Sequence, residues 1–152
     1  MQVGHGEKAK QLFMEGYNCS QAVLGAFCEE CGLDFDTAMK MSSSFGGGMG
    51  RLREVCGAVS GMFMVAGLIY GYDDPTAQEE KAKHYERIQK LAEKFRKENG
   101  SIVCRELLGL AEKKSEPKPE QRSAEYYKKR PCPEMVKMEA EIMEQDINQN
   151  LR

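Results

Sequence analysis

Residues 55–72 read VCGAVSGMFMVAGLIYGY and contain no charged side chain. The stretch lies at the lower end of the length needed to span a bilayer. It carries four glycines, a serine and a cysteine, however, and the rest of the chain is strongly polar, so we expect no membrane insertion. A helix that is apolar on every face is otherwise the buried centre of a helical bundle. The sequence therefore predicts a central helix that is covered on all sides.

The glycines of this stretch form two pairs with a spacing of four, Gly57 with Gly61 and Gly67 with Gly71. Residues four apart share one face of a helix, and glycine on such a face lets a neighbouring backbone approach closely. Each helical glycine costs about 1 kcal/mol relative to alanine, so we expect close packing to offset that cost. A glycine-lined face also suits the association of two copies, and a homodimer is left open.

The sequence on either side of the central stretch predicts further helices. Apolar residues recur at helical spacing, and capping residues such as Asn18 and Asp34 precede two of the segments. The expected helices are residues 7–15, residues 19–30, a short helix after Asp34, a long helix ending near Asn99, residues 102–111, and a last helix from about Pro133. The long helix is capped either by Thr76 with Glu79 or by Asp74, which precedes Pro75. An exposed connection is expected over about residues 112–130. The expected fold is all-α: one domain, residues 1–152, built as a bundle of about five to six helices around a central apolar, glycine-rich helix.

Composition narrows the classes of function. A formal net charge of −2 argues against nucleic-acid binding, because no basic excess is available to replace counterions. Residues 1–10 carry no apolar signal segment, so a cytoplasmic location is expected. In a reducing compartment, six cysteines are more often catalytic, metal-binding or simply buried than permanently bridged.

Four of the six cysteines, Cys19, Cys56, Cys104 and Cys132, are widely spaced, with gaps of 37, 48 and 28 residues. Each falls near the start of a different predicted helix, so only folding could bring them together. Free N–H groups and the helix dipole at such a start stabilise a thiolate and lower its pKa. The simpler alternative is that they are small buried hydrophobic residues. We expect one shared redox or metal-binding site.

Cys28 and Cys31 form the one close pair, in the order Cys-Glu-Glu-Cys. The pair lies at the end of a predicted helix, where the dipole and the two acids raise a thiol pKa rather than lower it. This setting does not favour a thioredoxin-type motif, and a structural role is expected for both residues.

A glycine-rich segment, FGGGMGR over residues 45–51, precedes the central helix. It matches neither a P-loop nor a dinucleotide-binding fingerprint. It is either a tight turn that packs near Cys56 or a set of N–H donors for cluster sulfurs or an anion, and the candidate binding residues are Gly46, Gly47, Gly48 and Arg51. The two histidines suggest no ligand role: His5 is expected in a mobile terminus and His84 on a helix surface.

Several segments together resemble the C_GCAxxG_C_C family of redox-active proteins. The matching segments are residues 16–23 (GYNCSQAV), 45–51 (FGGGMGR), 56–61 (CGAVSG) and 104–109 (CRELLG). The resemblance implies that Cys19, Cys56, Cys104 and Cys132 are the four signature cysteines, and that Cys28 and Cys31 lie outside the pattern. The family name contains Gly-Cys-Ala, whereas residues 55–58 read Val-Cys-Gly-Ala, so the agreement is looser there.

Three functions remain open on these grounds. In the first, the four thiolates ligate an iron–sulfur cluster for electron transfer with an unknown redox partner protein. In the second, a cofactor-free protein cycles the same cysteines between thiol and disulfide. In the third, the chain is a structural zinc-binding or interaction bundle. Whether the protein is an enzyme is left open.

Overall fold

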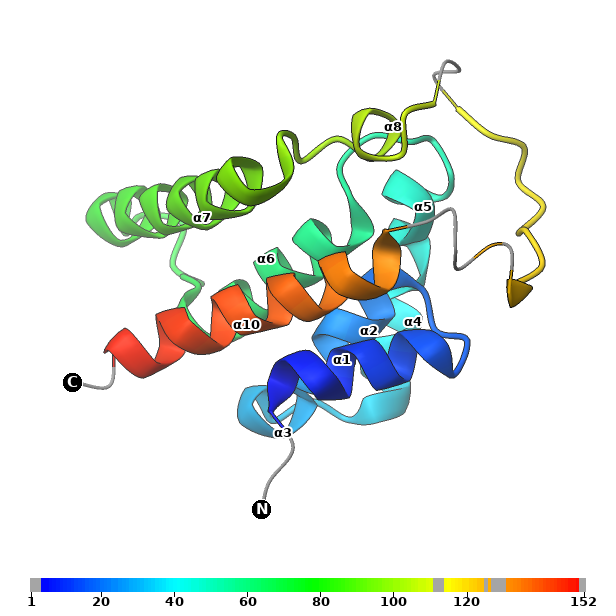
Figure 1. Cartoon of the computed structure of the whole chain (residues 1–152). Helices are drawn as coiled ribbons and strands as arrows, with labels where there is room; N and C mark the ends of the chain where they lie inside the picture. The colour runs from blue at the N-terminus through cyan, green and yellow to red at the C-terminus, as the bar shows by residue number, and fades with distance from the viewer. Residues whose placement is uncertain (1–3, 111–113, 125, 127–130, 151–152) are drawn as a thin grey trace.

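The computed structural model describes residues 4–110, 114–124, 126 and 131–150 (Figure 1). Among the described residues all the regular elements are helices, and the one further pairing is an isolated antiparallel bridge between Val55 and Val103. The elements are α1 (His5–Met14), α2 (Cys19–Ala26), α3 (Cys28–Cys31), α4 (Phe35–Ser42), a 3₁₀ turn (Ser43–Phe45), α5 (Gly46–Met49), α6 (Gly57–Tyr70), α7 (Gln78–Asn99), α8 (Cys104–Leu107) and α10 (Cys132–Asn150). Among these residues six helices have eight or more residues, so the prediction of an all-α fold with five to six main helices is confirmed.

Helix α6 lies within the uncharged stretch over residues 55–72, and its first half forms the centre of the core. Six residues of this half are buried: Gly57, Ala58, Val59, Ser60, Gly61 and Met62. A Cβ atom placed on Gly61 would lie 2.8 Å from the Ser20 carbonyl oxygen and 3.0 Å from the Val23 Cβ. Helix α2 therefore packs backbone against backbone on this glycine face, as the first glycine pair predicted.

The second half of α6 differs from the prediction of a helix covered on all sides. Leu68 is 44% exposed, and a Cβ atom on Gly67 would meet no atom within 4 Å. Val65 and Ala66 of this half are buried, and Tyr70 at its end contacts both α7, through the Arg87 guanidinium over its ring, and α10, through a hydrogen bond with the Asn150 side chain. Gly67 therefore serves no close packing with a neighbouring helix, whereas a Cβ on Gly71 would lie 2.1 Å from the Gly67 carbonyl oxygen of the same helix. Within the described residues no helix is both long enough and apolar enough to cross a membrane.

Helices α1, α2 and α10 complete the core. Asn18 caps α2 as predicted: its side chain accepts from the Gln21 N–H, and the Gln21 side chain accepts in return from the Asn18 N–H. The helix predicted over residues 19–30 is interrupted at Phe27, which leaves helical geometry between α2 and α3. The fully buried Phe27 side chain belongs to the core, so packing decides this break.

Helix α7 begins later than its predicted cap. Its N-cap is Ala77, with no side-chain hydrogen bond, and Thr76 instead donates to the Asp74 carboxylate in a tight turn. The capping prediction for Thr76 and Glu79 is therefore wrong. The end of α7 is as expected, with Gly100 at φ +88°. The predicted exposed connection is largely exposed over residues 114–124; residues 112, 113, 125 and 127–130 of that prediction lie outside the described part of the chain.

His5 is not in a mobile terminus but is the first residue of α1. Its two ring nitrogens each lie 2.6 Å from a carboxylate oxygen, one of Glu144 in α10 and one of Glu30 in α3. The ring also stacks on Phe27, with centroids 4.2 Å apart. Burial lowers the pKa of His5, but the hydrogen bonds and charges of Glu144 and Glu30 outweigh it, so the pKa is raised overall. The imidazolium ties three helices together.

Two alanine substitutions on α6 test the glycine face. Gly61→Ala should lower the free energy of unfolding by about 1–3 kcal/mol, because the added Cβ overlaps the α2 backbone. Gly67→Ala should raise it by about 1 kcal/mol, because the added methyl meets open space and alanine favours the helix. Urea denaturation of both variants measures the contrast. Equal shifts of the same sign would contradict the packing described here.

The His5 bridge predicts a pH-dependent stability. Since the folded pKa of His5 lies above its ordinary value of 6.5, the protonated ring stabilises the fold fully below that value. This contribution is lost as the pH rises through the folded pKa. His5→Gln should therefore cost more stability at pH 5.5 than at pH 8, measured by urea denaturation. His84→Gln is the control, because burial and the charge of Arg87 lower the pKa of His84, which reverses the sign.

Candidate four-cysteine site

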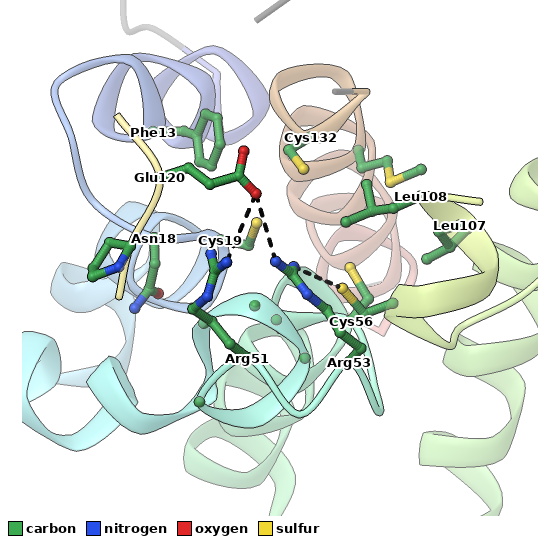
Figure 2. A pocket seen from close by; sticks show the side chains of 18 of the residues that line it. Phe13, Asn18, Cys19, Arg51, Arg53, Cys56, Leu107, Leu108, Glu120 and Cys132 are labelled. Atoms are coloured by element: carbon green, nitrogen blue, oxygen red, sulfur yellow. Dashed lines mark hydrogen bonds and ion pairs between the residues drawn. The ribbon is translucent and has the colours of Figure 1, made fainter. Parts of the chain in front are cut away.

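The starts of α2, α6, α8 and α10 meet at one end of the molecule (Figure 1). Cys19, Cys104 and Cys132 are the first residues of α2, α8 and α10, and Cys56 is the N-cap of α6. All four side chains line one cavity with a volume of about 310 Å³ (Figure 2). Segments far apart in the sequence thus bring together the four cysteines singled out from their spacing.

Cys56 and Cys104 are brought together by the isolated bridge. The Cys56 N–H donates to the Ile102 carbonyl oxygen at 2.8 Å, and the Cys104 N–H donates to the Glu54 carbonyl oxygen. These bonds align residues 53–56 antiparallel to residues 102–105 immediately before α6 and α8 begin. The register of this pairing places both thiols on the same cavity.

Cys19 and Cys132 approach from the other side of the cavity. The Asn18 cap fixes the start of α2, and a Cβ on Gly57 would lie 3.1 Å from the Cys19 Cβ, so Cys19 lies against the start of α6. Helix α10 packs along α1, which leads directly towards α2, and this places Cys132 near Cys19. The two thiols are hydrogen-bonded to each other.

The glycine-rich segment forms the floor of the cavity. Gly47 and Gly48 have φ angles of +66° and +68°, and a Cβ on Gly48 would lie 2.6 Å from the Cys104 Cβ. Only glycine fits there. Three non-glycine residues that follow, Met49, Arg51 and Arg53, also have positive φ angles, a strain that concentrates at functional sites. Gly46, Gly47, Gly48 and Arg51 all line the cavity, and their role in holding a cofactor stays a prediction.

The thiol pKa values differ from the sequence-based expectation. Hydrogen bonding with Cys132, burial and the charges of the other three cysteines raise the pKa of Cys19 well above its ordinary value. Burial, followed by the charge of Glu139, raises the pKa of Cys56 to about 12. The N–H groups of Ala58 and Val59 at the start of α6 lower the pKa of Cys56 as predicted, but burial outweighs them. The expected lowering by helix starts is therefore wrong in sign for both residues.

An arginine and a glutamate beside the thiols were not singled out from the sequence. The Arg53 side chain is only 5% exposed, and its Nη1 donates to the Cys104 Sγ at 3.6 Å. Its Nη2, together with Nη2 of Arg51, faces the Glu120 carboxylate (Figure 2). Arg51 and Arg53 follow the glycine-rich segment directly in the sequence, and this pattern could have predicted a basic group beside the thiols.

Glu139 is a third residue missed from the sequence. It is fully buried on α10, and neither carboxylate oxygen has a hydrogen-bond partner among the described residues. Burial raises its pKa well above the ordinary value, because it disfavours the charged carboxylate. The signal was present: Glu139 interrupts the apolar stripe of the last helix, formed by Met135, Val136, Ile142 and Met143.

Cys28 and Cys31 do not line the cavity and lie together on α3. Cys28 is buried in the core, and its thiol donates to the Leu24 carbonyl oxygen at 3.6 Å. Burial, followed by the charges of Cys28 and Glu30, raises the pKa of Cys31 to about 11. The prediction that this pair has raised pKa values is confirmed.

The chemistry available to the cavity follows from its donors. Four soft sulfur ligands suit transition metals and iron–sulfur clusters. The described part of the chain contains no group of three His, Cys, Asp or Glu side chains close enough together to hold one metal ion. The four thiols line one cavity, and the buried Arg53 guanidinium lies beside the Cys104 sulfur.

Comparison with known proteins agrees with this site. A family model with the description "Putative redox-active protein (C_GCAxxG_C_C)" matches residues 17–145, most of the chain, including all four cavity cysteines. Neither the curated proteins nor the solved structures give a match. The chain belongs to the C_GCAxxG_C_C family of redox-active proteins.

Proposed function

We propose that the protein is an electron carrier whose Cys19, Cys56, Cys104 and Cys132 ligate an iron–sulfur cluster. The observation that carries the proposal is the convergence of four thiols from four helix starts on one cavity. Four cysteines are the usual ligand set for such clusters. When bound, the cluster would supply reversible one-electron transfer.

The raised pKa values support a cluster over a free thiol nucleophile. A thiol exchanges disulfides as its thiolate, and burial keeps Cys19 and Cys56 protonated near neutral pH. Iron ions in the cavity would supply the positive charge that four neighbouring thiolates need.

Residues of the chain around the thiols have defined roles in this proposal. Arg53 would donate a hydrogen bond to the Cys104 sulfur, which lowers the charge density on that ligand. Gly48 would let the loop backbone lie against Cys104. Leu107, Leu108 and Met135 would keep water from the apolar side of the cavity.

Serine substitutions test the ligand set. After anaerobic reconstitution, the wild-type protein should bind iron and acid-labile sulfide and absorb in the visible range. Each of Cys19→Ser, Cys56→Ser, Cys104→Ser and Cys132→Ser should lose most of the iron and sulfide, because serine replaces a soft thiolate. Cys28→Ser and Cys31→Ser are the matched controls and should retain both. Wild-type protein that remains free of iron and sulfide would refute the proposal.

A second candidate is a cofactor-free dithiol, favoured by the direct hydrogen bond between Cys19 and Cys132. In this case the two thiols would be oxidised to one disulfide, with two electrons and two protons passing to an oxidant such as a disulfide of a partner protein.

Mild oxidation of the reduced, metal-free protein with oxidised glutathione distinguishes this candidate. A Cys19–Cys132 disulfide should appear in peptide mass spectra, with the loss of two titratable thiols. The Cys132→Ser variant should lose this product while leaving Cys28 and Cys31 unchanged. An unaltered thiol count in the wild type would remove the candidate.

A further inference from the structure

One wall of the four-cysteine cavity is not helical. It is formed by the segment over residues 115–122, four of whose residues line the cavity: Pro117, Pro119, Glu120 and Arg122. The whole segment belongs to no helix, and its residues 116–121 are all exposed. Proline has no N–H, so neither proline of the segment donates a backbone hydrogen bond. A segment of this kind buries little apolar surface and gains little stability from regular backbone pairing.

The other walls are fixed by the helical core and by backbone pairing. Cys19 begins α2 and Cys56 caps α6, and these two helices pack backbone against backbone. In the floor, the Gly48 carbonyl oxygen accepts from the Glu54 N–H at 2.9 Å, and the Glu54 carbonyl oxygen accepts in turn from the Cys104 N–H. Moving these walls would break helix packing or backbone pairing, whereas moving the segment over residues 115–122 would break neither.

Arg51 and Arg53 tie the first end of the segment to the floor. Arg51 Nε donates to the Glu116 carbonyl oxygen at 2.6 Å, and the Ser115 N–H donates to the Arg51 carbonyl oxygen at 2.9 Å. Arg53 Nε donates to Ser115 Oγ at 2.9 Å. The Nη2 atoms of both arginines also face the Glu120 carboxylate, at 3.8 Å and 3.9 Å (Figure 2). This end of the segment is therefore firmly anchored.

Arg122 ties the second end to the turn between α1 and α2. Its guanidinium donates to the carbonyl oxygens of Phe13 and Tyr17 and stacks on the Phe13 ring. The Phe13 carbonyl oxygen also accepts from the Gly16 N–H at 3.1 Å, so the turn keeps a backbone bond of its own. Loss of the Arg122 side chain would therefore remove these contacts together and leave the end of α1 capped.

We propose that residues 115–122 form a gate, which swings about its anchored first end and admits metal ions and small thiol-reactive molecules to the cavity. Opening breaks the contacts of Glu120 and Arg122, so the closed state dominates and opening is transient. Because the helical core stays intact, opening needs less free energy than global unfolding. Segments that open in this way control access to many buried sites. The inference goes beyond the proposed function and does not depend on what the thiols bind.

Arg53 connects the gate to the site itself. The same guanidinium that donates to Ser115 Oγ donates through Nη1 to the Cys104 sulfur at 3.6 Å. The anchored end of the gate thus lies one side chain away from a cavity thiol.

Alkylation of the reduced, metal-free protein with iodoacetamide measures the opening. The reaction forms a carbon–sulfur bond, with release of iodide and transfer of the thiol proton to buffer, and needs an accessible thiol. Arg122→Gln should raise the rates at the four cavity cysteines about tenfold relative to Cys31, as expected when hydrogen bonds from a charged group are lost. Peptide mass spectrometry follows each cysteine separately. Cys31 is partly exposed outside the cavity and serves as the reference, and Cys28, buried in the core, reports opening of the core and should not change.

Matched variants separate access from charge. Removing a cation near the cavity disfavours thiolates and slows alkylation, so a faster reaction in Arg122→Gln comes from access. Arg122→Lys keeps the charge but loses the guanidinium fork, and it should also raise the cavity rates. Lys118→Gln removes the same charge from an exposed side chain of the gate outside the cavity lining, and should leave the rates unchanged. Unchanged cavity rates in Arg122→Gln, or an equal rise at Cys28, would overturn the proposal.

Discussion

Where α2 meets α6, Gly57 and Gly61 let two backbones touch, with carbonyl oxygens and Cβ atoms of α2 in the space that side chains would otherwise fill. This contact fixes the position of the start of α2 relative to the start of α6, and therefore of Cys19 relative to Cys56. A larger side chain at Gly57 would displace Cys19, because its Cβ would lie only 3.1 Å from the Cys19 Cβ. The Phe45 carbonyl oxygen, 2.9 Å from the same position, blocks the other direction. The two helices and the glycine loop thus form one rigid frame for the cavity.

The site combines features that oppose one another. Helix starts favour thiolates at Cys56, yet burial and the neighbouring groups keep the thiols protonated. Glu139 adds to this opposition, because burial disfavours its charged form and that charge, when present, raises the pKa of Cys56 further. Such an arrangement is poorly suited to an exposed nucleophile. It suits a group of thiols whose protonation changes when a cation binds in the cavity or when the thiols are oxidised or reduced.

The sequence predicted most of the frame because local chemistry decides it. The uncharged run of α6, the Asn18 cap and the glycine ends of α3 and α7 are all readable from neighbouring residues. It did not predict the tie at His5, because Glu30 and Glu144 are distant in sequence. Nor did it predict the exposure of Leu68, which depends on how α7 lies.

For the site, the sequence identified the four cysteines but not their surroundings. The Val55–Val103 bridge consists of a single residue pair, too short to leave a strand pattern. The sign of the thiol pKa shifts depends on burial and on the mutual approach of the four groups, neither of which has a local signature. Arg53 and Glu120 meet only because the segment over residues 115–122 passes beside the four-cysteine cavity.

The neighbouring positions of Cys19 and Cys132 have a consequence for the unfolded chain. Any covalent or coordinate link between these two residues would close a loop of more than 100 residues and restrict the denatured ensemble, by about 4.7 kcal/mol for a loop of about 100 residues. Oxidation to a disulfide, or binding of a cluster, would thus cross-link the start of α2 to the start of α10. The occupancy of the redox site would then set how long the protein survives heat and proteolysis.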